Sequence, residues 1–205
     1  MMKSALVLLL AGSAAAFAPS SQKASTSALS AVLDDMPGNT KPVGPWDPLE
    51  LATLGSDSTL AWFRAAELKH SRVAMLATTG YLVQGAGFHF PGMLSSDVSF
   101  ESLSTMKPFD AWTAVPALGQ AQIFFTLFLA ECISEAQGTH YTKGGSTPTV
   151  IFPPIDFSGV DPVALKKKQS SELNNGRLAM IAIMSFVAEA NIPGSVPVLT
   201  GIDAW

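Results

Sequence analysis

The sequence predicts an all-α membrane protein with three transmembrane helices, in which the first and third helices cross and are related by a pseudo-two-fold internal repeat. Three observations lead to this prediction. Charged residues make up 14% of the 205 residues, where a soluble domain carries about 25%, and the mean hydropathy is +0.31. The segment 111–130 contains no charged residue. A nine-residue motif occurs twice, once on either side of that segment.

Composition also excludes several classes of protein. The chain carries 12 Lys and Arg against 16 Asp and Glu, for a formal net charge of -4. Without an excess of basic residues, nucleic acid is not an expected partner. A single cysteine, Cys132, rules out an internal disulfide framework, and three histidines leave little room for a histidine-rich metal site.

The N-terminus reads as a targeting sequence. Residues 1–16 combine a lysine, a short apolar run and an A-x-A pattern, which is typical of a signal peptide. Residues 17–30 contain no acid and are rich in Ser, Thr and Ala, as in a plastid transit peptide. The Ala-Phe-Ala-Pro junction between them resembles the bipartite leaders of algae with complex plastids. Simple secretion with a disordered Ser-rich start is the alternative. Residues 31–205 are expected to form the functional domain.

Three helices are predicted in this domain. The first covers about 58–85, beginning at an N-cap near Asp57 and ending at a Gly-rich stretch before Pro91. The second covers about 111–135 and is long and apolar enough to span a bilayer, with Pro116 near its start. The third covers about 170–190, up to Pro193-Gly194. Hydropathy alone supports only the second as a membrane span.

The repeat supports the other two spans. Glu67–Met75 and Glu172–Met180 both read E-L-x-H/N-x-R-V/L-A-M, and an Asp-Pro turn precedes each copy. Two equivalent helices separated by one span run in the same direction across a membrane. We therefore expect a pseudo-two-fold axis along the membrane normal.

The charges of the motif are expected to pair between helices. A Glu and an Arg five residues apart lie about 140° apart around a helix, which is poor geometry for pairing within it. An unpaired charge in a membrane helix costs several kcal/mol. Two parallel copies can exchange partners, so we predict the pairs Glu67–Arg177 and Glu172–Arg72. The simplest interpretation is that these pairs only lock two helices together.

His70 and Asn175 lie one turn beyond each glutamate and suggest a further role. The motif supplies single oxygen or nitrogen atoms to an apolar surface, whereas zinc needs about four ligands and calcium six to eight. This pattern favours a metal already held in a macrocycle that lacks one axial ligand. The magnesium of chlorophyll fits this description, and haem, the competitor, usually takes His, Cys, Met or Tyr.

The duplicated motif, the Ala-Phe-Ala-Pro leader, the stretch 172–181 and the Ile-Pro-Gly-Ser-Val-Pro segment at 192–197 resemble the light-harvesting chlorophyll-binding family. The most similar branch is that of the chlorophyll a/c antennae, and the resemblance covers about residue 42 to the C-terminus. It implies an antenna protein, not an enzyme. Such a protein binds chlorophyll a, chlorophyll c and a carotenoid (fucoxanthin, peridinin or a related xanthophyll) and passes excitation energy to a photosystem.

The resemblance also implies which residues bind pigment. Arg72 and Arg177 are the cross-paired partners. In the middle helix Gln120 competes with Gln122, because either could be a capping residue, and Glu135 is expected to be solvated. The axial ligands to chlorophyll magnesium are expected to be Glu67, His70, Gln122, Glu131, Glu172, Asn175 and Glu189. Glu189 must bind a metal, find a partner or be protonated.

The expected location is the plastid thylakoid membrane, as a multi-pass protein. Lys166–Lys168 places the starts of the first and third helices, and the N-terminus, on the stromal side. Expected partners are a photosystem I or II core, neighbouring antenna subunits and thylakoid lipid. Two alternatives stay open: a photoprotective, energy-dissipating member with acids such as Asp97 and Glu101 in a lumenal loop, or a small transporter or proton-pathway protein that uses the Glu/Arg pairs.

Overall fold

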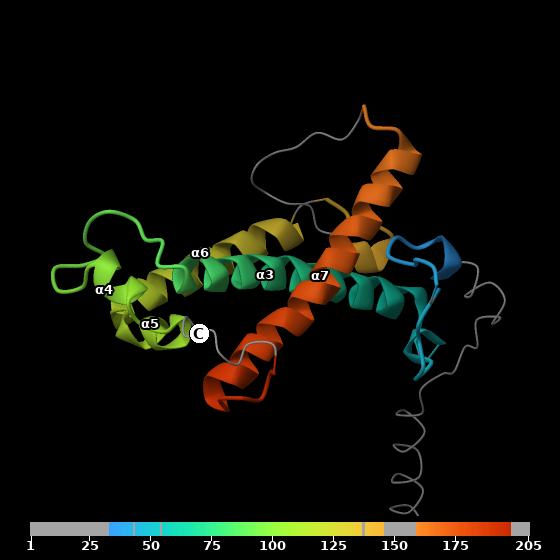
Figure 1. Ribbon diagram of the computed structural model, residues 1–205. Coiled ribbons are helices and arrows are strands. Elements are labelled where there is room, and N and C mark those ends of the chain that lie inside the picture. Colours follow the sequence, from blue (N-terminus) through green and yellow to red (C-terminus); the bar gives the residue numbers. More distant parts are fainter. Residues whose placement is uncertain (1–32, 43, 54, 137, 146–158, 198–205) are drawn as a thin grey trace, which may run out of the picture.

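The computed structural model describes residues 33–42, 44–53, 55–136, 138–145 and 159–197, so the predicted leader segments 1–16 and 17–30 lie outside the described residues. The named elements of the described chain are all helical, as predicted (Figure 1). Three long helices dominate, and shorter ones connect them. The elements are η2 (Leu51–Thr53), α3 (Asp57–Gly85), α4 (Phe100–Ser104), α5 (Pro108–Ala114), α6 (Ala117–Ala136), η3 (Tyr141–Lys143) and α7 (Pro162–Asn191).

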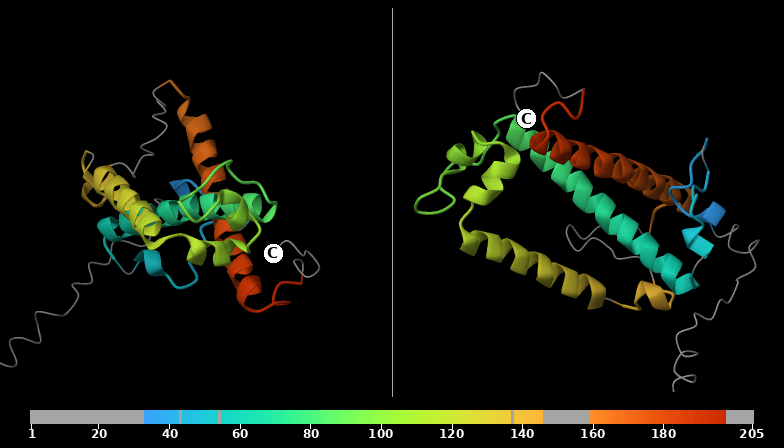
Figure 2. Two further views of the ribbon diagram at one scale, coloured as in Figure 1. Left: turned by 90° about the vertical axis from the view of Figure 1, so that its left-hand side faces the viewer. Right: turned by 90° about the horizontal axis from the view of Figure 1, so that it is seen from below.

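Helices α3 and α7 cross near their middles (Figures 1 and 2). They contain 29 and 30 residues, which at 1.5 Å per residue is about 45 Å each. They come close together at Ser71 and Gly176, which occupy the same position in the two motif copies. A Cβ atom on Gly176 would lie 2.3 Å from Ser71 Cβ. Glycine at this position therefore lets the two backbones approach.

Small and aliphatic side chains fill the crossing. Leu68 and Leu173 are again equivalent motif positions, and both are buried. The alanines of the interface, Ala65, Ala74 and Ala179, are at most 8% exposed. Such small side chains allow close packing between helices.

An aromatic contact secures the far end of the crossed pair. Tyr81 of α3 stacks on Phe186 of α7, with ring centroids 4.8 Å apart and an interplanar angle of 11°. The same tyrosine ring lies 5.3 Å from Phe109 of α5. The end of α3 is thereby joined to both neighbouring helices.

The prediction of one continuous helix over 111–135 is wrong, because the chain breaks between α5 and α6. Val115 is extended (φ -67°, ψ 131°), as expected for a residue before proline. In a continuous helix the Trp112 carbonyl would accept from the N–H of residue 116, which Pro116 lacks. That carbonyl instead accepts from the Val115 N–H at 3.3 Å and from Gln120 Nε2 at 2.8 Å.

The predicted start of the third helix near residue 170 is also wrong, since α7 begins at Pro162. Proline is favoured in the first helical turn, where its φ angle is already helical and its missing N–H is not needed. No helix-breaking residue follows until the motif. Lys166–Lys168 therefore lies within the first two turns of α7 rather than before the helix.

Helix α6 is the most apolar of the long helices. By length and composition, the segment Ala117–Lys143, which contains α6, is the one candidate membrane span among the described residues. No residue of α6 is buried, and every side chain in 121–133 is exposed. An apolar helix of this kind needs lipid or another apolar ligand around it.

Candidate functional site

The two ion pairs that the sequence predicts are both formed. Arg177 Nε donates to Glu67 Oε1 at 2.7 Å, and Arg72 Nε donates to Glu172 Oε1 at 2.7 Å. Each of the crossed helices supplies the carboxylate of one pair and the guanidinium of the other. The pairs lie on either side of the contact between Ser71 and Gly176, so the polar groups of the crossing neutralise each other.

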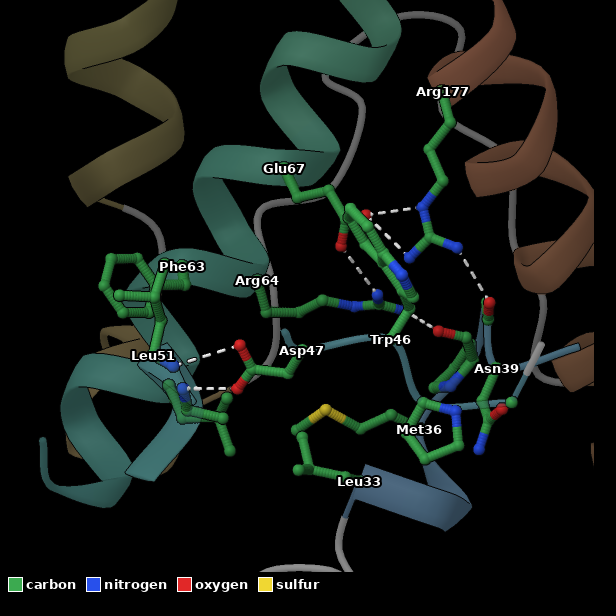
Figure 3. Close-up of a pocket in the computed structure, with 16 residues that line it drawn as sticks. Leu33, Met36, Asn39, Trp46, Asp47, Leu51, Phe63, Arg64, Glu67 and Arg177 are labelled. Carbon is green, nitrogen blue, oxygen red and sulfur yellow. Dashed lines mark hydrogen bonds and ion pairs between the residues drawn. The ribbon is translucent and has the colours of Figure 1, made fainter. Parts of the chain in front are cut away.

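Sequence reasoning missed Arg64, which is a second partner of Glu67. Arg64 Nη1 donates to Glu67 Oε2 at 3.0 Å, and the spacing of three residues on one helix was the signal that could have found it. Arg64 Nη2 also donates to the Pro37 carbonyl, and Arg177 Nη1 donates to the Gly38 carbonyl at 2.8 Å. The two arginines therefore hold the segment before α3 against the crossing (Figure 3).

The second copy of the motif has fewer cations. The position equivalent to Arg64 is Gln169, and Arg72 is the cation that contacts Glu172. Among the described residues, no donor reaches Glu172 Oε2. The side chains of this pair are 28% and 31% exposed. Glu172 therefore depends on one arginine, whereas Glu67 has two.

His70 and Asn175 present one unshared acceptor atom each. His70 Nδ1 lies 2.8 Å from the Ala66 carbonyl oxygen. A carbonyl can only accept, so Nδ1 carries the proton and the Nε2 lone pair is left available. Asn175 Nδ2 lies 3.5 Å from Ser171 Oγ, which leaves the amide oxygen Oδ1 available. Both side chains are exposed.

In the middle helix, the structure distinguishes the two glutamines. Gln120 Nε2 donates to the Trp112 carbonyl, whereas the exposed side chain of Gln122 makes no hydrogen bond to the described residues. Glu131 is paired with Lys69 of α3 at 2.5 Å and is 60% exposed. The expectation that Glu135 is solvated is wrong, because Lys69 Nζ and His140 Nε2 both contact its carboxylate.

Glu189 finds partners in the turn that follows α7. Its carboxylate accepts hydrogen bonds from the N–H groups of Gly194 and Val196, each at 2.8 Å, and from Ser195 Oγ at 3.3 Å. The sequence left three outcomes open for this residue: binding a metal, finding a partner or being protonated. In the described structure, the carboxylate has partners.

A cavity of about 610 Å³ lies beside Glu67. Arg64, Glu67 and Arg177 form the charged part of its wall beside the crossing, and the rest of the lining is mostly apolar, with Asn39 and Asp47 as further polar side chains (Figure 3). Asp47 shapes the adjoining turn, because its carboxylate accepts from the N–H groups of Leu51 and Ala52 at 3.0 and 2.8 Å. The apolar lining includes Leu33, Met36, Trp46, Leu51, Leu60 and Phe63.

The donor chemistry fits a preformed metal macrocycle better than a bare ion. Among the described residues, no three His, Cys, Asp or Glu side chains lie close enough together to hold a metal ion. The acceptors instead stand singly on long helices that also carry exposed apolar side chains. The fold and the site thus define a helical protein with exposed apolar surfaces, on which polar acceptor atoms stand singly.

The family model described as "Chlorophyll A-B binding protein" matches residues 31–191. The chain therefore belongs to this family of light-harvesting, chlorophyll-binding antenna proteins.

Curated relatives place it near one branch of the family. It is 34% identical over 200 residues to fucoxanthin-chlorophyll a-c binding protein C of Phaeodactylum tricornutum, covering 93% of this chain and 96% of the relative. Protein A of that organism is 35% identical over 199 residues, covering 95% and 99%. The fucoxanthin-chlorophyll a-c binding protein of Chattonella marina var. antiqua is 33% identical over 201 residues, covering 93% and 88%. All three names describe chloroplastic, pigment-binding proteins, and none of the three mentions peridinin.

Proposed function

We propose that this protein is a light-harvesting antenna that binds chlorophyll a, chlorophyll c and fucoxanthin and transfers excitation energy to a photosystem. The observation that carries the proposal is the pairing at the crossing of α3 and α7. Because the motif charges neutralise each other, a polar anchor can stand in an apolar surrounding on each helix. The names of the relatives support the choice of pigments.

In this proposal each pigment is held by one side-chain atom. His70 Nε2 and Asn175 Oδ1 ligate magnesium from α3 and α7, and the neutralised carboxylates of Glu67 and Glu172 are further ligands on the same two helices. The exposed Gln122 and Glu131 do the same from opposite faces of α6, since nine residues turn the helix by about 900°. Chlorophyll supplies the excited state. The protein holds each ring at a defined place and keeps water away from it.

The proposal includes a membrane topology. Helices α3, α6 and α7 span the thylakoid membrane of a plastid, with α3 and α7 related by the pseudo-two-fold repeat and the N-terminus on the stromal side. The Glu–Arg pairs lower the cost of placing the charged helices α3 and α7 in lipid, where an unpaired charge costs several kcal/mol. Pigment and lipid cover the exposed apolar surface of α6, and a photosystem core and further antenna subunits are the partners.

An absorption spectrum and a fluorescence excitation spectrum of the full chain, isolated gently from its membrane, test this function. Chlorophyll a, chlorophyll c and fucoxanthin are expected to migrate with the protein. The carotenoid band is expected in the excitation spectrum of chlorophyll fluorescence, because energy transfer needs fixed, short pigment distances. A folded but colourless protein would contradict the proposal, and ion flux in liposomes would then support the transporter alternative.

Replacing Glu189 by Ala tests whether this residue only closes a turn. The N–H groups of Gly194 and Val196 lose their acceptor, so their hydrogen exchange is expected to accelerate by about tenfold, the equivalent of about 1.4 kcal/mol. The number of chlorophylls per polypeptide is expected to stay the same. Exchange mass spectrometry and pigment extraction measure the two quantities. Ser195→Ala, which removes only the hydroxyl donor, is the matched control, and loss of one chlorophyll in Glu189→Ala alone would make Glu189 a ligand.

A further inference from the structure

Lys69 joins α3 to α6 through two carboxylates. Its Nζ atom lies 2.5 Å from Glu131 Oε2 and also contacts Glu135 Oε1. The lysine side chain is 29% exposed, so most of it is covered although it carries a charge. Glu131 and Glu135 are four residues apart and therefore share one face of α6.

The chain repeats one arrangement at three glutamates. Glu67 is paired with Arg177, Glu172 with Arg72 and Glu131 with Lys69. In each pair, the glutamate and the cation lie on two different long helices. The first two pairs belong to the repeated motif, whereas Lys69 occupies a motif position that carries Asn174 in the other copy. The third pair is therefore a separate feature of this chain.

The geometry at Glu131 suits a carboxylate that has a second contact to make. Lys69 binds Oε2, and no donor from the described residues reaches Oε1. The glutamate side chain is 60% exposed on the apolar surface of α6. A carboxylate bound to the neutral ring of a magnesium chlorin would leave one negative charge in lipid, which is costly without a cation beside it.

Lys69 is itself held from the other side. Glu135 Oε1 contacts its Nζ atom, and Glu135 Oε2 accepts from His140 Nε2 at 2.8 Å. His140 Nδ1 lies 2.7 Å from Thr142 Oγ1, beside η3. This chain of hydrogen bonds restricts where the ammonium group can lie, and so restricts the carboxylate of Glu131.

We propose that Lys69 is a positioning residue for a pigment bound at Glu131. It neutralises the carboxylate and holds Oε2, so that Oε1 faces outward as the axial ligand of a magnesium chlorin. This inference rests on the proposed function and adds to it a residue at the third motif position, where the two copies differ.

The test is refolding of the full chain with a mixture of chlorophyll a, chlorophyll c and fucoxanthin, followed by extraction of the bound pigment. Four variants are compared with the wild type: Lys69→Met, Lys69→Arg, Glu131→Gln and the double variant Lys69→Met/Glu131→Gln. Lys143→Met is the matched control, since it removes an equal charge from η3, just beyond the C-terminal end of α6. Lys143 has no carboxylate partner among the described residues. Visible circular dichroism reports whether the remaining pigments keep their arrangement.

Lys69→Met is expected to lose about one chlorophyll per polypeptide, while Lys69→Arg, Glu131→Gln and Lys143→Met retain it. The double variant is expected to regain the pigment, because a neutral amide ligand needs no cation. A double variant as deficient as Lys69→Met would overturn the inference and make Lys69 only a tether between helices. A fully loaded Lys69→Met would overturn it as well. A wild type that takes up no chlorophyll would instead contradict the proposed function itself.

Discussion

Replacement of Arg72 by Leu is expected to reduce the yield of pigmented protein more than replacement of His70 by Ala. Arg72 is the cation that contacts Glu172, at 2.7 Å, and both side chains are more than two thirds buried. Removing one partner of a buried pair costs about 3–5 kcal/mol, because the other charge is left uncompensated. His70→Ala removes an exposed side chain that lies outside both Glu–Arg pairs, and with it about one pigment.

The measurement is the yield of pigmented protein after refolding of each variant with the same pigment mixture. We expect Arg72→Leu to fall at least about tenfold below the wild type, the equivalent of 1.4 kcal/mol or more. His70→Ala is expected to assemble with one chlorophyll fewer. Adding Glu172→Gln to Arg72→Leu is expected to restore much of the yield, because no charge is then stranded. A lower yield for His70→Ala than for Arg72→Leu would contradict this ranking.

Replacement of Gly176 by Ala is expected to lower the thermal stability of the pigmented protein. The added methyl group would lie 2.3 Å from Ser71 Cβ and 3.0 Å from Ser71 Cα, so the two helices must separate. Overpacking of this kind costs about 1–3 kcal/mol. Separation would also lengthen both Glu–Arg pairs, which lie on either side of this contact.

Thermal unfolding followed by visible circular dichroism measures this effect. Gly80→Ala is the matched control, because Gly80 lies on α3 with no atom within 4 Å of an added Cβ. In that open position alanine is expected to be neutral or to stabilise the helix by up to about 1 kcal/mol. Adding Ser71→Gly to Gly176→Ala removes the Ser71 Cβ atom that the new methyl group would clash with, and is expected to recover stability. Equal melting of Gly176→Ala and Gly80→Ala would show that the close approach is unimportant.

The features that the sequence predicted correctly depend on patterns repeated along the chain. The motif spacing places Glu67 and Arg72 on different sides of one helix, so only a second helix can supply their partners. The two pairs therefore follow from helix geometry and from the high cost of an unpaired charge in an apolar surrounding. Family membership follows from the same motif, because it combines charged, small and apolar positions in one order.

The tertiary structure alone decided contacts between residues far apart in the chain. Lys69 and Glu131 are 62 residues apart, and no periodicity links them. Gln120 could be distinguished from Gln122 only when the structure showed that Gln120 Nε2 donates to the Trp112 carbonyl across the break at Pro116.

By itself, the sequence determined the helical class and the paired charges, because these follow from local spacing and from the surrounding medium. Only the tertiary structure decided the lysine on Glu131 and the turn closed by Glu189. Proximity in the folded chain selects these partners. The local sequence around them does not identify them, because other residues of the same types have similar local sequences.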